Sequence, residues 1–294
     1  VVPVRQVWMK YKKIERKREK TMKKLVAGFL AVVLLAGCGA KSDDTGKEDK
    51  TLRIGASTTP HAEIIKHIQP ALEKEGYTVK ITEFTDYVKP NQALVDGDLD
   101  ANFFQHKPYM DDWAKKAGAQ DKITSVFSVH FEPIGIYSVN HKSLDEVKDG
   151  MKISVPNDPT NGGRALKLLA DNNIITLKDG KGVDATKSDI AKYNVKVEII
   201  EMQAETCAAS IQDVDYAVVN GNNALNAKIS ENVLTTESKD SEAAKTYGNI
   251  IAVQTAHKDD EKIKALINAL NTEDVKNYID ETYHGIVVPL VPTK

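Results

Sequence analysis

The chain has 294 residues, of which 41% are hydrophobic, and its 40 Lys and Arg against 42 Asp and Glu give a formal net charge of -2. Ten of those bases but only two of those acids lie in residues 1–37, so the rest of the chain is acidic, with a net charge of about -10. Such a chain is a poor candidate for binding nucleic acid or an anionic membrane surface.

Residues 22–37 have the pattern of a secretory signal peptide. Two lysines after Met22 precede an apolar run from Leu25 to Ala36, which is too short to span a bilayer, since that takes about 20 apolar residues. Cys38 completes Leu-Ala-Gly-Cys, which resembles the bacterial lipobox, in which the cysteine is lipidated. The alternative is an ordinary signal peptide with an accidental cysteine. We expect an extracytoplasmic protein that a lipid on Cys38 anchors to the cell membrane.

The segments on either side of this signal have separate interpretations. Residues 1–21 precede a start-like methionine that has its own basic segment, so we expect them to be an upstream extension that the mature protein lacks. Residues 38–50 carry no large apolar side chain and mix charged residues with Gly, Ser and Thr, which is typical of a flexible tether. Because the lipid uses Cys38, Cys207 has no partner for a disulfide within the chain.

From Thr51 onward, short apolar runs alternate with amphipathic stretches. The first predicted elements are a strand at 52–57, a helix at 60–75, a strand at 78–84, a helix at 90–95 and a strand at 99–104. This β-α-β-α order predicts an α/β fold, in which helices pack on a sheet. Further strands are predicted at 134–139, 152–155, 195–200, 216–219 and 250–253.

Two distant segments, Ala93–Gln105 and Ala209–Gly221, mirror each other. Each runs from the end of a helix, through an Asp-x-Asp turn, into an apolar strand that ends in polar residues. In open α/β sheets the carboxyl ends of strands face the ligand crevice. Either the chain folds into two α/β lobes that share a cleft, or two generic helix-turn-strand sequences are alike by coincidence.

No catalytic signature is present after the signal peptide, where there is no G-x-S-x-G elbow, H-E-x-x-H, P-loop or S-x-x-K set. Cys207 lies among small apolar residues of an expected helix and is interpreted as a buried apolar residue. A zinc site made of His106, His130 and distant acids stays open. We therefore expect no enzymatic activity, no cofactor and no metal.

The strongest polar motif is Pro156–Leu169. Gly162 and Gly163 precede a helix that we expect to begin near Arg164. Backbone N–H groups at the start of that helix, together with Asn161 and the guanidinium of Arg164, would form a receptor for a carboxylate. The alternative is a capped helix with a surface arginine. The paired glycines favour the receptor, because glycine lets a ligand approach the backbone closely.

Four segments in order make the chain recognisable: GDLDANFFQHKPYMDDW, HFEPIGIYS, ISVPNDPTNGGRALKLL and DVDYAVVNGNNAL. With the lipobox, they resemble the methionine-binding lipoproteins of bacterial ABC importers, the NlpA/MetQ family, from Met22 to the terminal GIVVPLVP. The resemblance implies a two-lobed periplasmic-binding-protein fold of type II, whose hinged lobes close on a small ligand. We expect residues 51–133 and 249–294 to form lobe 1 and residues 134–248 to form lobe 2.

The resemblance also implies where the ligand binds. In the family, an aromatic residue and a histidine of the first motif hold the thioether chain, an Asn and an Arg of the third hold the carboxylate, and a strand-end asparagine helps to hold the α-amino acid group. The matching residues in this sequence are Phe104 and His106 with Phe103 beside them, Asn161 and Arg164, Asn220, and, as a less secure aromatic match, Tyr87.

The resemblance implies a monomeric protein that captures L-methionine and delivers it to the permease and ATPase of an ABC importer. Asn223 departs from the family, which commonly has an aromatic residue there. If that position touches ligand, the pocket is roomier or wetter, and a methionine-containing dipeptide becomes the alternative ligand. A metal-binding importer component, a secreted hydrolase and a surface adhesin are the remaining alternatives.

Overall fold

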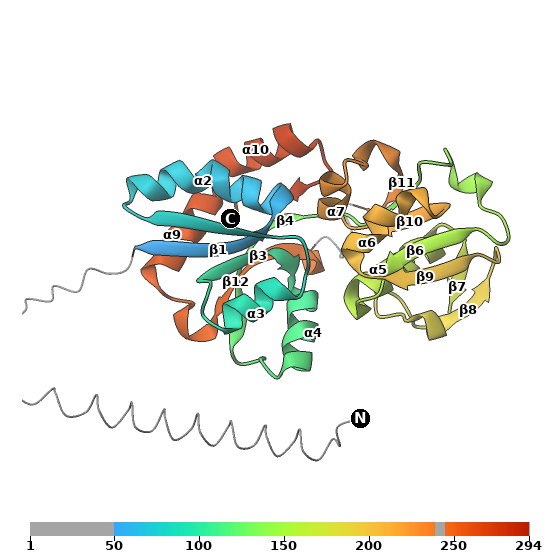
Figure 1. Cartoon of the computed structure of the whole chain (residues 1–294), viewed down its shortest axis with the longest axis horizontal. Helices are drawn as coiled ribbons and strands as arrows, with labels where there is room; N and C mark the ends of the chain where they lie inside the picture. Colours follow the sequence, from blue (N-terminus) through green and yellow to red (C-terminus); the bar gives the residue numbers. More distant parts are fainter. Residues whose placement is uncertain (1–49, 239–244, 294) are drawn as a thin grey trace, which may run out of the picture. The chain divides into compact units, whose positions relative to one another are not determined.

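The computed structural model describes residues 50–238 and 245–293, so the predicted signal peptide, Cys38 and all but the last residue of the tether lie outside the described residues. The described strands form sheets of six, five and two strands with helices packed on them (Figure 1). The predicted α/β class is therefore confirmed. None of the described helices is both long and apolar enough to cross a membrane.

The six-stranded sheet has the strand order β13-β4-β12-β3-β1-β2. Its strands are β1 (Thr51–Ser57), β2 (Thr78–Phe84), β3 (Ala101–His106), β4 (Ile123–Phe131), β12 (Gly248–Gln254) and β13 (Val288–Pro289). β1 pairs in parallel with β2 and β3, whereas β12 pairs antiparallel with β3 and β4. The last part of the chain thus joins a sheet that the first part began.

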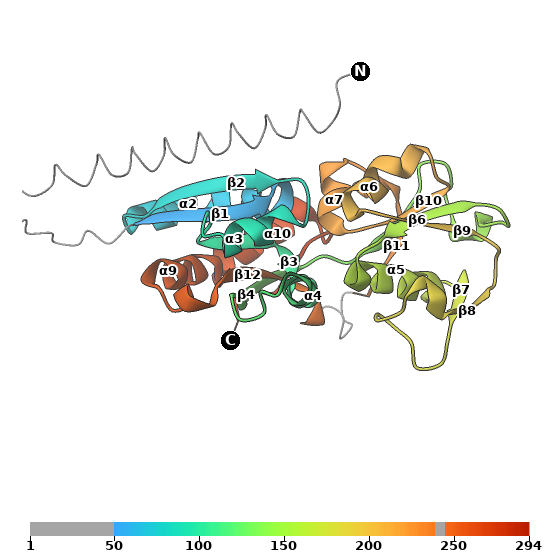
Figure 2. The ribbon, with the colours of Figure 1, turned by 60° about the horizontal axis from the view of Figure 1, so that its bottom comes forward.

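Helices cover both faces of this sheet (Figure 2). They are α2 (Glu63–Lys74), α3 (Lys89–Val95), α4 (Lys107–Ala117), α9 (Glu261–Leu270) and α10 (Glu273–Tyr283). On one face, α2, α9 and α10 share a hydrophobic core with Ile251 and Val253 of β12. On the other face, α3 and α4 pack with Ile250 and Ala252. Successive side chains of the strand therefore point to opposite faces of the sheet, as the pleated backbone requires.

The five-stranded sheet has the strand order β11-β5-β10-β6-β9. Its elements are β5 (Gly135–Tyr137), β6 (Lys152–Pro156), β9 (Glu198–Met202), β10 (Tyr216–Val219) and β11 (Val233–Thr236), with α5 (Pro159–Asp171) on one face and α6 (Ala204–Ala209) and α7 (Gly221–Asn226) on the other. A hairpin of β7 (Ile175–Leu177) and β8 (Ile190–Tyr193) packs beside α5. Cys207 is fully buried in the core between α6 and the sheet, as predicted for a small apolar residue.

The chain passes from the six-stranded to the five-stranded sheet between β4 and β5 and returns between β11 and β12. Polar residues stand where several strands end. His106 closes β3, Asn157 follows β6, and Asn220 follows β10. Because the carboxyl ends of strands in open α/β sheets border the ligand crevice, these ends are where a binding site is expected.

Helix α5 begins earlier than predicted, at Pro159 and not near Arg164. The side chain of Asp158 caps the helix by accepting a hydrogen bond from the backbone N–H of Asn161 at 2.9 Å. Pro159 occupies the first turn of the helix. Backbone N–H groups there have no acceptor within the helix, so the N–H that proline lacks costs no helical hydrogen bond. Asn161 and Arg164 therefore lie three residues apart on one face of the first turns.

The paired glycines of α5 have a different role from the one we inferred. A Cβ on Gly163 would lie 1.9 Å from the carbonyl oxygen of Val183, and a Cβ on Gly162 would lie 2.8 Å from that of Pro156. Both distances are far below van der Waals contact. The glycines thus let the chain pack against its own backbone, and our interpretation that they serve the approach of a ligand is wrong.

We expect Gly163→Ala to destabilise the protein by about 3 kcal/mol, at the upper end of the usual cost of overpacking. The backbone carbonyl of Val183 cannot rotate away as a flexible side chain could. Gly182→Ala is the matched control, because a Cβ there meets no atom within 4 Å. Urea unfolding of both variants tests this. Equal stability of the two would contradict the backbone contact.

Candidate ligand-binding site

A small cavity lies where β3, α5 and the residues after β10 come together. Its volume is about 20 Å³, which is room for about one water molecule. It is lined by Tyr87, Phe104, Gln105, His106, Tyr109, Glu132, Asn161, Arg164, Asn220, Asn222 and Asn249. These include all the residues that we predicted to bind ligand except Phe103.

Phe103 and its neighbour Phe104 face opposite sides of β3. The ring of Phe103 is fully buried in the core with α2 and α9, 4.6 Å from the ring of His61 between centroids. Phe104 instead lines the cavity, where its ring lies 6.0 Å from that of Tyr87 and 6.1 Å from that of Tyr109. Three aromatic rings from the side of the six-stranded sheet therefore form one wall.

His106 connects this aromatic wall to helix α5. Its Nδ1 accepts a hydrogen bond from the backbone N–H of Tyr109 at 3.2 Å, so its Nε2 carries the hydrogen and donates to Oδ1 of Asn161 at 3.1 Å. Burial, and then the charge of Arg164, lower the pKa of His106 to about 3, so the ring is neutral near pH 7. Both of its nitrogens are engaged, so neither is open to the zinc site that the sequence left possible.

Arg164 is almost completely buried, with 1% of its surface exposed, so the alternative of a surface arginine is excluded. Its guanidinium makes a two-point ion pair with Glu237, at 3.1 Å from Nε and 2.7 Å from Nη2. It also donates to the backbone oxygen of Glu132 at 3.0 Å and to Oδ1 of Asn161 at 3.3 Å. The Tyr247 ring lies 4.6 Å away. These contacts fix the position of the Arg164 guanidinium at the edge of the cavity.

Asn220 presents an unsatisfied acceptor to the same space. Its Nδ2 donates to Oδ1 of Asn161 at 2.8 Å. Its own Oδ1 is buried and has no hydrogen-bond partner among the described residues. A buried acceptor without a partner costs free energy, and that cost is recovered when a donor arrives. Asn220 is therefore suited to receive an N–H group of a ligand.

Asn223 contacts the rim of the site and is not among the residues that line the cavity. Its Nδ2 donates to the Tyr87 hydroxyl at 3.0 Å, and that hydroxyl donates to Oδ1 of Asn222 at 2.6 Å. Burial raises the pKa of Tyr87 well above its usual value, so the hydroxyl stays protonated as a donor. Asn223 thus makes a hydrogen bond between α7 and the aromatic wall.

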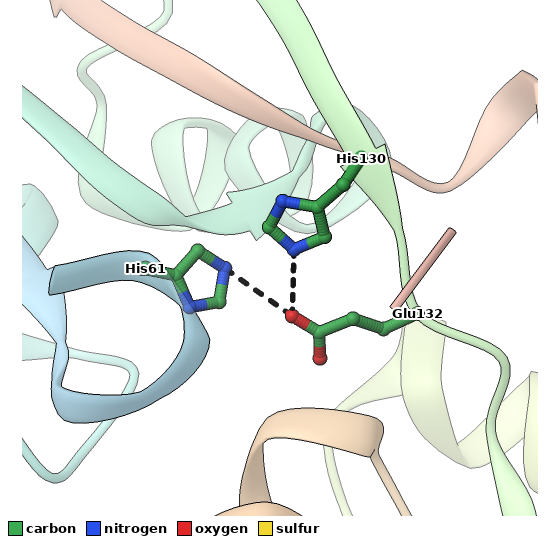
Figure 3. A group of neighbouring side chains, drawn as sticks. All are labelled: His61, His130 and Glu132. Atoms are coloured by element: carbon green, nitrogen blue, oxygen red, sulfur yellow. Dashed lines mark hydrogen bonds and ion pairs between the residues drawn. The ribbon is translucent and has the colours of Figure 1, made fainter. Parts of the chain in front are cut away.

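Potential metal ligands come together at one place in the described part of the chain: His61, His130 and Glu132, whose ligand atoms lie within 4.8 Å of one another (Figure 3). All three side chains are buried. Glu132 belongs to this group and to the cavity lining at once.

The model of the NlpA lipoprotein family matches residues 52–291. The chain belongs to this family. The methionine-binding lipoprotein MetQ of Bacillus subtilis is 37% identical over 92% of this chain and 99% of its own length, and the D-methionine-binding lipoprotein MetQ of Salmonella typhimurium is 36% identical over 88% of this chain and 94% of its own.

Solved structures of similar chains agree with this NlpA membership. A lipoprotein from Ruminococcus gnavus has a TM-score of 0.79 at 47% identity, covering 82% of this chain and 99% of its own. A nutrient-binding protein from Burkholderia cenocepacia, solved bound to methionine, has a TM-score of 0.75 at 41% identity, covering 81% and 99%. The predicted two-lobed fold of substrate-binding proteins and the predicted absence of an enzymatic role are thereby confirmed.

Two acidic residues at the site of this NlpA protein were not identified from the sequence. Glu132 lies in the recognised segment HFEPIGIYS, where a lone carboxylate in an apolar run was a signal of a special role. Glu237 lies 73 residues from its partner Arg164 and has no motif around it. Only the folded chain brings Glu132 to the cavity and Glu237 to Arg164.

Proposed function

We propose that this protein is the substrate-binding lipoprotein of an ABC importer, and that it captures L-methionine and delivers it to the importer's permease and ATPase. One observation carries the proposal. A single cavity joins an aromatic wall, made by Tyr87, Phe104 and Tyr109, to a buried guanidinium and four asparagines. The relatives whose names include methionine, and the one solved with methionine bound, support the choice of ligand.

The two walls suit the two ends of methionine. Sulfur contacts with aromatic rings contribute about 0.3–1.5 kcal/mol each, so the aromatic wall suits a thioether. A carboxylate is bound best by a charge-assisted hydrogen bond. Arg164 pairs with Glu237 through Nε and Nη2 and would bind the ligand through Nη1, the nitrogen that donates to Oδ1 of Asn161. Asn220 offers its unpartnered acceptor to the α-amino group. Methionine is the amino acid whose two ends match these walls.

Entry of methionine requires the walls to separate. A cavity of about 20 Å³ is far smaller than the roughly 300 Å³ or more of typical ligand pockets. We infer that lobe 1, residues 51–133 and 249–294, moves against lobe 2, residues 134–248, about the two crossings of the chain. The aromatic wall then belongs to lobe 1 and the Arg164 fork to lobe 2, so only the closed state engages both ends of the ligand.

A larger pocket beside the cavity supports a second candidate ligand, a methionine-containing dipeptide. It has a volume of about 440 Å³ and shares Tyr87 and Tyr109 with the cavity. Its other lining residues include Asp86, Lys89 and Glu205. A ligand longer than one amino acid would extend from the cavity into this pocket.

We further infer that Cys38 carries the lipid anchor, that the mature protein is extracytoplasmic, and that it acts as a monomer. The lipobox and the membership in a lipoprotein family support this arrangement. Lipid anchoring keeps a binding protein close to its permease, and two acyl chains hold far more firmly than one, since each buried CH₂ contributes about 0.8 kcal/mol.

Mass spectrometry of the small molecules released when the purified protein is denatured tests the proposal. We expect L-methionine in a one-to-one ratio with the protein. Calorimetric titration of the stripped protein with L-methionine, D-methionine and methionyl dipeptides then ranks the ligands. Binding of none of these would refute the function, and tighter binding of a dipeptide would favour the second candidate.

A further inference from the structure

We propose that Glu132 is the counter-ion for the α-ammonium group of the ligand, and that His61 and His130 are positioning residues for its carboxylate. This inference rests on the proposed function and specifies its substrate class. The ligand would need a free, protonated α-amine beside its carboxylate.

The carboxylate of Glu132 is buried, with 5% of the residue exposed, and lines the cavity. Its Oε1 lies 2.8 Å from Nε2 of His130 and 3.4 Å from Nε2 of His61 (Figure 3). Its Oε2 accepts a hydrogen bond from the backbone N–H of Asn222 at 2.7 Å. Burial alone would raise the pKa of Glu132, but the hydrogen bond from His130 holds it below its usual value.

The unpartnered ring nitrogens indicate which nitrogen of each histidine carries its hydrogen. Nδ1 of His61 and Nδ1 of His130 are buried with no hydrogen-bond partner among the described residues. A neutral imidazole carries one hydrogen, and burying it without an acceptor is costly. The hydrogen therefore sits on Nε2 of each ring, where His130 donates to Glu132 and His61 donates to Oδ1 of Asn249 at 2.9 Å.

The ring of His61 does not cancel the charge of the Glu132 carboxylate. Burial lowers the pKa of His61 to about 4, which agrees with a neutral ring near pH 7. Arg164 contacts only the backbone oxygen of Glu132, and its own ion pair is with Glu237, so the Glu132 carboxylate has no cationic partner among the described contacts of Arg164. An ionised buried carboxylate without a cation is expensive, so a ligand that brings a positive charge is favoured.

Free acceptors at the cavity match the hydrogens of an ammonium group. A carboxylate accepts about four hydrogen bonds, and Oε2 of Glu132 accepts one from the described residues, that from Asn222. Oδ1 of Asn220, at the same cavity, accepts none from the described residues. An amide nitrogen offers one hydrogen and no charge. N-acylated methionine, and dipeptides in which methionine is the second residue, should therefore bind poorly.

The same three side chains have the distances of a metal site, but their second contacts do not fit one. A histidine that binds a metal through one nitrogen almost always donates its other N–H to an acceptor. Neither Nδ1 has such an acceptor in the described part of the chain. The Nε2 atoms, which a metal would need, carry the hydrogens that His130 donates to Glu132 and His61 donates to Asn249.

The first experiment is calorimetric titration of the stripped wild-type protein with L-methionine, N-acetyl-L-methionine and methylthiobutyrate, which lacks the amino group. We expect both analogues to bind at least about 30-fold more weakly than L-methionine, as for a buried charge left without its partner. No methionine binding would refute the proposed function itself. Equal binding of methionine and both analogues would overturn this inference and leave the proposed function standing.

Variants then assign the effect to Glu132. Glu132→Gln should lose at least about 30-fold in affinity for L-methionine but bind methylthiobutyrate as the wild type does. Asp100→Asn is the control, since that carboxylate is also largely shielded, with 8% of its side chain exposed, pairs with Arg53 and Lys262, and is not among the residues that line the cavity. Its methionine affinity should not change. Unaltered methionine binding in a folded Glu132→Gln protein would overturn the assignment.

Variants of His130 test its positioning role. His130→Leu should reduce the preference for L-methionine over methylthiobutyrate, and His130→Gln, which retains an N–H donor, should restore part of it. If His130 has only a structural role, its variants should lose affinity for both ligands equally. That result would overturn the positioning role of His130. Titration with Zn²⁺ is the last experiment of this series. Stoichiometric zinc binding that Glu132→Gln abolishes would replace the ammonium site with a metal site.

Discussion

Replacing Arg164 with alanine should weaken methionine binding by about 30-fold to several-thousand-fold. The variant leaves a ligand carboxylate desolvated without its charged partner, which costs about 2–5 kcal/mol, and each 1.4 kcal/mol is about tenfold in affinity. The loss should be similar for every α-amino acid, because all of them share the carboxylate. Calorimetric titration with methionine and alanine measures it.

The ion pair with Glu237 complicates this experiment and supplies its control. Arg164→Ala also leaves the Glu237 carboxylate, which is 11% exposed, without its cation. The single variant should therefore lose stability as well as affinity. Adding Glu237→Gln removes the unpaired charge, so the double variant should regain stability and still bind methionine weakly. Wild-type affinity in a folded Arg164→Ala protein would mean that the carboxylate binds elsewhere.

The sequence predicted most strands of the two large sheets but missed β11, β13 and β4, the longest one. Its residues, ITSVFSVHF, do not alternate strictly between apolar and polar. The pairing of β4 with β12 shifts register twice, near Ile250 and near Ala252. Each irregularity breaks the period of two on which strand prediction depends. The missed strand leads directly into Glu132, so the acid at its end was missed with it.

The parts of the site that the sequence predicted belong to compact local motifs. Asn161 and Arg164 are three residues apart on one helix, and Phe104 and His106 share one strand. The remaining contacts depend on pairing between distant segments: the partner of Arg164 lies on another element, and Asn249 reaches His61 from near the other end of the chain. No local period or spacing predicts such contacts, because they are set by packing of the whole fold.

The neighbouring residues Phe103 and Phe104 show the limit of a motif match most clearly. Both were predicted to hold the ligand, yet the structure places Phe103 in the core with α2 and α9 and Phe104 at the cavity. A strand turns successive side chains to opposite faces. A motif that contains both rings cannot state which face each one serves until the strand is assigned.

Alanine substitutions at these two positions should therefore have opposite consequences. Phe103→Ala should cost about 3–5 kcal/mol of stability, as expected for removing a fully buried ring, and should leave the preference for methionine over alanine intact in the folded protein. Phe104→Ala should cost less stability and should reduce that preference by about tenfold, since only methionine has a side chain that reaches the ring.

Urea unfolding and calorimetric titration of both variants separate the two roles. The pair is matched, because the same side chain is removed from adjacent residues of one strand. If Phe103→Ala reduces the preference for methionine over alanine while Phe104→Ala only lowers stability, the two faces of β3 are reversed, and the thioether lies on the side of α2 and α9. If neither variant changes the preference, the thioether does not contact β3, and the aromatic wall must consist of Tyr87 and Tyr109 alone.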